Sequence, residues 1–168
     1  AFTISSDPEN SLKFTSSYKN MKENRDRTFI SLGNLLERFL RVIPDGVLLF
    51  VQSHELLKQM IIKWHSTRIF NSLNAIKPLY YEDKSKDIKQ QIEDYKNKIK
   101  TGCGGFFIGV CRGQLSEGID FSDSQARAVI IFGIPYPSWN SAEVKLKIEY
   151  NDRHSADYLK DKLMKGSE

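Results

Sequence analysis

The chain has 168 residues, 40% hydrophobic and 27% charged, a composition typical of a globular domain with a buried core. Its 25 basic and 21 acidic residues give a formal charge of +4, which permits contact with a polyanion without requiring it. No apolar run approaches the roughly 20 residues of a membrane span and no signal-peptide pattern is present, so we expect no membrane partner. The chain starts at Ala1 rather than methionine, and we expect it to be part of a longer protein.

Residues 1–27 are polar and poorly periodic, and they predict one short strand, FTI (2–4), followed by a long loop. Helical spacing of apolar residues starts at Thr28 and ends at PDG (44–46). The residues that carry this spacing are Phe29, Leu32, Leu35, Leu36, Phe39 and Leu40. The run GVLLFVQ (46–52) then predicts a strand that is buried on both faces.

Ser53 is placed to cap a second helix, with Glu55 in its first turn at the positive end of the helix dipole. The apolar stripe of that helix consists of Leu56, Leu57, Met60, Ile61 and Trp64. A short strand around PLYYE (78–82) follows. A charged helix near 86–100 comes next, and its inward face consists of Ile88, Ile92, Tyr95 and Ile99.

The remaining pattern is a strand at 105–111, a polar loop, a strand at 126–132, a turn at 133–139 and a helical tail at 142–164. Alternating helices and apolar strands predict an α/β fold with an open, mainly parallel sheet and helices on both faces. We assign residues 1–27 to an N-terminal segment and 28–168 to the domain. Ligands of such sheets bind beyond the carboxyl ends of the strands, so the loops at 52–55, 113–123 and 133–139 are the candidate site.

The loop CRGQLSEGIDFSD (111–123) excludes several familiar sites by its spacing. It has the two glycines of a P-loop but Ile119 and Asp120 where lysine and serine or threonine are required. Ser116 has Gln114 before it, so the G-x-S-x-G elbow of a nucleophilic serine is absent. The three histidines of the chain are scattered, and we expect no metal site.

The same loop suits a nucleotide or a phosphate backbone. Gly113 and Gly118 allow backbone N–H groups to approach anionic oxygens, and Arg112 and Ser116 can donate to phosphates. Glu117 and Asp120 can accept from a ribose hydroxyl or from arginines of another domain. The alternative is a tight connection between elements whose charges pair with local arginines such as Arg112 or Arg127, and chemistry alone leaves both interpretations open.

Cys103 and Cys111 are the only cysteines, and they do not form a C-x-x-C pair. We expect two free, mostly buried thiols in a reducing compartment.

Four segments resemble the XPD-like superfamily 2 DNA helicases. VCRGQLSEGIDFSDSQARAVIIFGIPYP (110–137) is similar to motif V of that family, R-G-K-x-S-E-G-[IL]-D-F, with its downstream strand and G-[IVL]-P-[YF]. VIPDGVLLFVQSHELLKQMIIKW (42–64) resembles the motif IV region of the family. KPLYYED (77–83) stands where the family has a similar strand. KIEYNDRHS (147–155) is most similar to the FANCJ-like and RTEL-like branch. The resemblance covers roughly residues 28–158.

The resemblance implies a second RecA-like motor domain of an ATP-dependent DNA helicase in DNA repair, located in the nucleus. By motif position, Ser53, His54, Arg112, Gly113 and Ser116 would contact single-stranded DNA. Glu117, Gly118 and Asp120 would face ATP and the first RecA-like domain of the same protein. The family implies ATP and Mg²⁺ as cofactors, a 4Fe–4S cluster elsewhere in the parent protein, and repair-complex proteins as partners.

Two departures from the family pattern qualify this assignment. Gln114 replaces the usual lysine of motif V, and His54 stands where tyrosine is common. The arginine-bearing motif VI, Q-x-x-G-R-x-x-R, does not follow residues 147–155, so we expect a truncated motor domain that holds no complete catalytic set and is inactive alone. The alternative is a non-catalytic RecA-like module that binds nucleic acid or a protein. The glycine pattern of a dinucleotide or nucleotide-sugar enzyme is absent from this sequence, which gives that interpretation little support.

Overall fold

The computed structural model describes residues 1, 3–9, 11–14, 18–83, 85–116, 119–134 and 141–165, which form two units. The first unit, Ala1–Pro135, contains all the strands described here. The second, Tyr136–Glu168, contains the helix α6 (Ala142–Lys165), as the helical tail predicted. None of the helices in the described ranges is both long and apolar enough to cross a membrane.

The first unit contains a four-stranded parallel sheet in the order β2-β3-β1-β4. Its strands are β1 (Gly46–Val51), β2 (Leu79–Tyr81), β3 (Gly105–Val110) and β4 (Ala128–Phe132). Its helices are α1 (Tyr18–Glu23), α2 (Arg25–Val42), α3 (His54–Ser66), α4 (Ile69–Ile76) and α5 (Ile88–Lys100), with a 3₁₀ turn η1 (Asp123–Ala126). The α/β prediction is confirmed.

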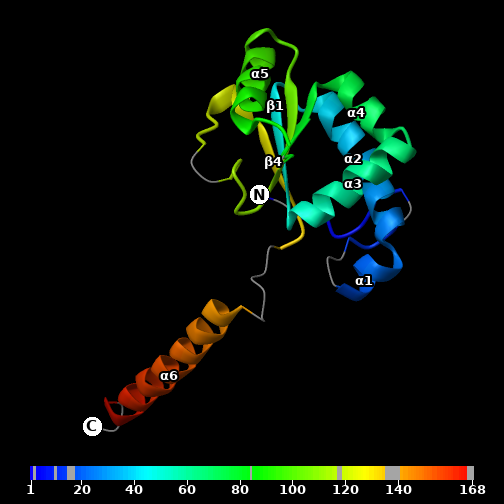
Figure 1. The fold of residues 1–168 in the computed structure, drawn as a ribbon. Helices are drawn as coiled ribbons and strands as arrows, with labels where there is room; N and C mark the ends of the chain where they lie inside the picture. Colours follow the sequence, from blue (N-terminus) through cyan, green and yellow to red (C-terminus); the bar gives the residue numbers. More distant parts are fainter. Residues whose placement is uncertain are drawn as a thin grey trace. The chain divides into compact units, whose positions relative to one another are not determined.

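Helices cover both faces of the sheet, as Figure 1 shows: α2, α3 and α4 on one side and α5 on the other. The strand order explains this arrangement. The chain passes from β1 over β3 to β2 and then returns from β2 to β3, so its direction across the sheet reverses. Right-handed crossovers in opposite directions place their helices on opposite faces.

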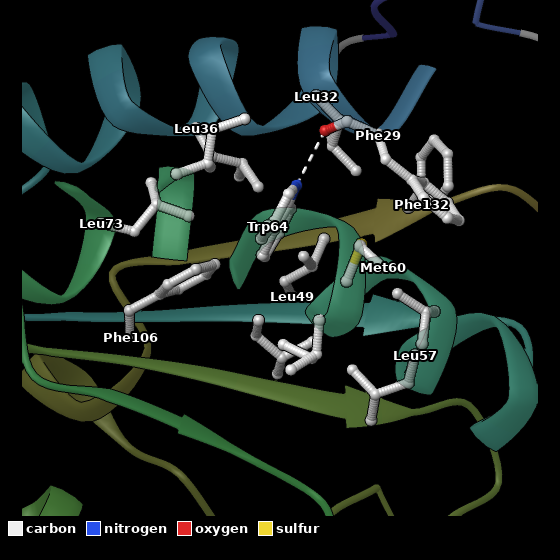
Figure 2. Close-up of a cluster of buried hydrophobic side chains, with 14 of the residues drawn as sticks. Phe29, Leu32, Leu36, Leu49, Leu57, Met60, Trp64, Leu73, Phe106 and Phe132 are labelled. Atoms are coloured by element: carbon white, nitrogen blue, oxygen red, sulfur yellow. Dashed lines mark hydrogen bonds between the residues drawn. The ribbon is translucent and has the colours of Figure 1, made fainter. Parts of the chain in front are cut away.

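Side chains alternate between two hydrophobic clusters along the central strand. Val47, Leu49 and Val51 of β1 pack with α2, α3 and α4, whereas Leu48 packs with α5. The fully buried Trp64 of α3 lies in the larger cluster, and its indole N–H donates to the backbone oxygen of Phe29 at 2.8 Å (Figure 2). That hydrogen bond satisfies the one polar group of a large buried side chain and joins α3 to α2.

Three details of the secondary structure differ from the expectations. Residues 3–5 form no strand, and the N-terminal segment instead makes an isolated bridge between Ser6 and Lys13. Helix α1 occupies part of the expected loop. Helix α4 was not predicted. Cys103 is exposed and Cys111 half-buried, so the expectation of mostly buried thiols was wrong, although both are free. Burial raises the pKa of the Cys111 thiol, which opposes its ionisation.

Candidate phosphate-binding cleft at the carboxyl edge of the sheet

The loops that follow β1, β2, β3 and β4 meet at one edge of the sheet because all four strands are parallel. The loops after β1 and β4 are joined directly, since the side-chain amide of Gln52 donates to the backbone oxygen of Ile134 at 2.8 Å. The loops after β1, β2 and β3 surround a cleft of about 820 Å³. Three of the predicted DNA-contacting residues, His54, Arg112 and Gly113, line this cleft.

Ser53 and His54 occupy the start of α3. The Ser53 hydroxyl oxygen accepts from the Leu56 N–H at 3.2 Å, so the predicted N-cap is confirmed. That bond uses a lone pair of the oxygen and leaves the hydroxyl hydrogen available to another acceptor. The His54 Nε2 atom lies 3.8 Å from the Glu82 Oε1 atom, at the wall of the cleft.

Glu82 is the residue that organises this edge, and the motif reasoning missed it. Its side chain is only 5% exposed. Oε2 accepts from the backbone N–H of Val110 at 3.0 Å, and Oε1 accepts from that of Gln114 at 2.9 Å. The paired register of β2 and β3 ends at Tyr81 and Ile108, so the carboxylate supplies the acceptors that the short strand no longer provides. Two charge-assisted hydrogen bonds offset the cost of burying the carboxylate.

The turn after β3 is fixed by further short-range bonds. The Gly113 N–H donates to the Val110 oxygen at 2.8 Å, and the Ser116 hydroxyl donates to the Gly113 oxygen at 3.0 Å. Leu115 is 1% exposed and packs into the smaller hydrophobic cluster. In this structure, therefore, the Gly113 N–H and the Ser116 hydroxyl serve the turn itself.

Gly113 has a steric role beside Glu82. A Cβ atom at this position would lie 2.6 Å and 2.7 Å from the two carboxylate oxygens of Glu82, closer than real contacts allow. The glycine therefore provides the space into which the buried carboxylate fits.

Arg112 lies in this turn, and its backbone is in the left-handed region, at φ 62°. Such a conformation costs an L-residue roughly 1 kcal/mol and persists because the surrounding bonds determine it. The Arg112 residue is exposed and forms no ion pair with a carboxylate in the described ranges. Arg127, the other local arginine, pairs instead with Asp45 at 3.2 Å.

The second half of the loop leads away from the cleft. Asp120 is exposed and does not line the cleft, and its backbone oxygen accepts from the Lys96 ammonium group at 3.1 Å. Phe121 packs edge-on against Tyr95 of α5, with ring centroids 5.9 Å apart. Glu117 and Gly118 lie outside the described residues. The nucleotide-facing role of these three positions stays a prediction.

The wall opposite His54 consists of the connection from β2 to α5, with Asp83, Lys86, Asp87 and Lys89. Sequence motifs gave no reason to select these residues. A usable signal was present, however, in the polar residues that start directly after the strand PLYYE, where parallel strands place their ligands. No group of three or more histidine, cysteine or acidic side chains within the described part of the chain is placed to hold a metal ion.

A family model described as the helicase C-terminal domain matches residues 36–166. The chain belongs to this family. All the residues that line the cleft lie inside the matched range, and the resemblance to the C-terminal domain of such helicases is confirmed.

Curated relatives agree with the family model. The chain is similar to the regulator of telomere elongation helicase 1 homologs of three fruit flies. It is 36% identical to that of Drosophila mojavensis over 136 residues, 80% of this chain. The identity is 33% over 154 residues, or 91% of the chain, for Drosophila grimshawi, and 36% over 130 residues, or 76%, for Drosophila melanogaster. The helicase-domain chain spans 13 to 15% of the length of these relatives.

Proposed function

We propose that this chain is the second RecA-like motor domain of an ATP-dependent DNA helicase of genome maintenance, and that its cleft holds the backbone of single-stranded DNA. The observation that carries the proposal is the position of Arg112. Its cationic side chain has no carboxylate partner in the described residues, and it lines a cleft inside the segment matched to the helicase family. A guanidinium on a turn that Glu82 fixes is a preorganised donor for phosphate.

The chemistry of the DNA contacts follows from the groups at the cleft. The His54 ring and the Arg112 side chain, which line the cleft, and the Ser53 hydroxyl, which caps the helix that starts at His54, can donate to phosphate oxygens. Such contacts carry no base information, so they suit an enzyme that moves along DNA of any sequence.

ATP would supply the energy for movement, and we propose that Glu117, Gly118 and Asp120 face it together with the first RecA-like domain. A loop with DNA contacts in its first half and nucleotide contacts in its second half would couple the nucleotide state to the grip on DNA. Mg²⁺ would accompany the ATP and be shared with the first RecA-like domain. A four-cysteine iron–sulfur cluster would need other parts of the enzyme, since this chain has two cysteines.

For the parent protein we propose XPD-like ancestry, a nuclear location, association with repair-complex proteins and movement in the 5′ to 3′ direction. The direction is tested with duplexes that carry a single-stranded tail at either end. Unwinding of the 5′-tailed duplex supports the proposal, and unwinding of the 3′-tailed duplex alone contradicts it.

The decisive experiment measures ATP hydrolysis by the full-length parent with and without single-stranded DNA, beside the same assay on this chain. We expect DNA-stimulated hydrolysis by the parent and none by the chain alone. Absence of hydrolysis in the parent would favour the alternative function, a non-catalytic module that binds nucleic acid or a protein through the same cleft.

Arg112→Ala in the parent should weaken binding of single-stranded DNA about fivefold near 0.1 M salt, uniformly across sequences, because one phosphate contact is lost. Fluorescence anisotropy with several oligonucleotide sequences measures this. Arg68→Ala is a matched control, since Arg68 is also an exposed arginine with a left-handed backbone, at φ 63°, but lies outside the cleft lining. Equal losses in both variants, or a loss for one sequence only, would contradict the assignment.

Asp120→Ala in the parent should lower ATP turnover on the order of tenfold to a hundredfold, because a misplaced contact at the nucleotide is costly. Since Asp120 is exposed, the melting temperature should stay near that of the wild type. The control is Asp94→Ala, which removes an exposed carboxylate from α5, outside the loop, and should leave turnover unchanged. A collapse of thermal stability without a specific loss of turnover would assign Asp120 a structural role.

A further inference from the structure

The cleft has a second group of cations, Lys86 and Lys89, that lies outside the motif segments named above. We propose that Lys86 and Lys89, on the connection from β2 to α5, bind backbone phosphates of the same single-stranded DNA that Arg112 contacts. This inference rests on the proposed function and extends it, because it adds a third loop to the DNA-binding surface.

The carboxylates of the cleft are occupied by the fold. Glu82 accepts from two backbone N–H groups of the loop after β3. Asp83 accepts from the Ser85 N–H at 3.0 Å and from the Ser85 hydroxyl at 2.9 Å, and these bonds lower the pKa of its carboxyl group. Asp87 is the N-cap of α5 and accepts from the Lys89 N–H at 2.9 Å. Each carboxylate therefore has a structural explanation that involves no ligand.

The cations of the cleft have no such explanation. Lys86, Lys89 and Arg112 make no ion pair with any carboxylate of the described ranges. The ammonium group of Lys86 lies 5.0 Å from the centre of the Tyr81 ring, which restrains the side chain beside the cleft without satisfying its hydrogen-bond donors. Within the described residues, the donors of these three cations therefore have no hydrogen-bonded carboxylate, although the nearby charge of Lys86 contributes to lowering the pKa of the Asp83 carboxyl group.

The position of Lys89 also argues against a purely structural role. It lies in the first turn of α5, where the positive end of the helix dipole disfavours a cation. Lys98 and Lys100, in the last turn of the same helix, stand where the dipole favours them. Local helix stability therefore accounts for the latter two lysines and not for Lys89.

Phosphate is the ligand that this arrangement fits. The cleft lining has three carboxylates and three permanent cations, so net charge does not select an anion; the unpaired donors do. Arg112 on the loop after β3 and two lysines on the connection after β2 line the same cleft and can hold more than one phosphate of an extended strand. A backbone that passes along the cleft would contact both loops.

The test uses the full-length parent and a fluorescein-labelled oligo(dT) of 20 nucleotides, with binding measured by anisotropy at several salt concentrations. We expect Lys86→Gln/Lys89→Gln to make the slope of log affinity against log salt shallower by about 0.7 per lysine, with roughly fivefold weaker binding per lysine near 0.1 M salt. Lys86→Arg/Lys89→Arg should retain wild-type binding, because the charge remains. Lys98→Gln/Lys100→Gln is the matched control and should leave the slope unchanged.

The outcomes separate this inference from the function on which it rests. If the parent binds oligo(dT) and Arg112→Ala weakens it, but Lys86→Gln/Lys89→Gln binds with the wild-type slope, the lysine site is wrong and the proposed function stands. If both lysine pairs change the slope equally, the effect is general charge and the site is wrong. If the wild-type parent does not bind oligo(dT), both proposals fail.

Discussion

The short strand β2 has a buried charged residue at each end, and the two ends use it differently. Lys77, 6% exposed, lies two residues before the strand, and its ammonium group donates to the backbone oxygen of Asp45 at 2.7 Å. Glu82, also 6% exposed, directly follows the strand and accepts from two N–H groups. Glu82 serves N–H groups beyond the end of the strand pairing, whereas Lys77 is a second donor to the Asp45 oxygen, which also accepts from the Gly105 N–H at 3.1 Å.

The difference lies in the charges around them. At the amino edge, the Asp45 carboxylate pairs with Arg127, and the Tyr95 hydroxyl donates to the Gln125 oxygen at 2.6 Å, so the polar groups serve the fold. At the carboxyl edge, Glu82 fixes a turn whose arginine, Arg112, is exposed and has no carboxylate partner in the described residues. The buried ammonium group of Lys77 therefore serves the packing of the amino edge, whereas the buried carboxylate of Glu82 fixes a loop that lines the cleft.

The largest expected effect is at the carboxyl edge. Glu82→Ala should lower the free energy of unfolding by about 2–4 kcal/mol, because two N–H groups lose their charged acceptor. Urea unfolding of this chain, followed by circular dichroism, measures the loss. Glu82→Gln should recover part of it, since the amide keeps one acceptor oxygen.

Asp83→Ala is the control for this prediction, since Asp83 is the next residue and its bonds are local, to Ser85. It should cost less than about 1 kcal/mol. If the two alanine variants lose the same stability, Glu82 does not hold the loop as its bonds indicate.

The next effect tests whether Gly113 and Glu82 form one unit. Gly113→Ala should cost about 1–3 kcal/mol, because the new Cβ atom would overlap the Glu82 carboxylate. In a Glu82→Ala background the carboxylate oxygens are absent and the same substitution should cost less, although the new Cβ atom would still lie 2.9 Å from the Val110 backbone oxygen. A double-mutant cycle from urea unfolding gives the coupling energy.

Gly102→Ala, at the amino edge, separates overlap from backbone strain. No atom lies within 4 Å of the Cβ that it would gain, but its φ of +79° is left-handed. The expected cost is about 1 kcal/mol and should be the same with or without Glu82. Additive costs for Gly113→Ala and Glu82→Ala would mean that the two residues act separately.

The sequence predicted the parts of the fold that depend on local pattern. The buried strands at 46–52 and 105–111, the Ser53 cap and the inward face of α5 all follow from periodicity and capping chemistry, and all are present. The FTI strand was wrong because β-propensity alone does not supply a neighbouring strand with which to pair. Helix α4 was missed because it has eight residues, starts after a left-handed Arg68 and depends on the burial of Ile69 and Leu73.

The candidate site was predicted only in part for a similar reason. Motif resemblance located Arg112 and His54, because those positions have recognisable neighbours in the chain. The role of Glu82 depends on bonds to residues 28 and 32 positions away, which no local pattern contains. Only the tertiary structure shows which carboxylates already have partners and which cations do not.

The smallest expected effect is at the amino edge and depends on pH. Burial lowers the pKa of Lys77, and the Asp45 carboxylate opposes this shift. Between the lowered pKa and the ordinary lysine value, the unfolded chain binds more protons, so Lys77 makes the free energy of unfolding rise with pH across that window. Lys77→Met keeps the stem and removes the charge. It should change stability at neutral pH by less than about 1 kcal/mol, because the lost hydrogen bond and the relieved burial of charge oppose each other.

The measurement is the difference in free energy of unfolding between wild type and Lys77→Met, from neutral pH to about pH 10. A difference is needed because burial raises the pKa values of Cys111, Tyr80 and Tyr95, so these groups lower stability as pH rises and act in both proteins. The wild type should gain stability relative to Lys77→Met as the pH increases. Lys98→Met, at an exposed lysine of α5, should show no such gain. A difference that stays constant with pH would mean that burial does not lower the pKa of Lys77.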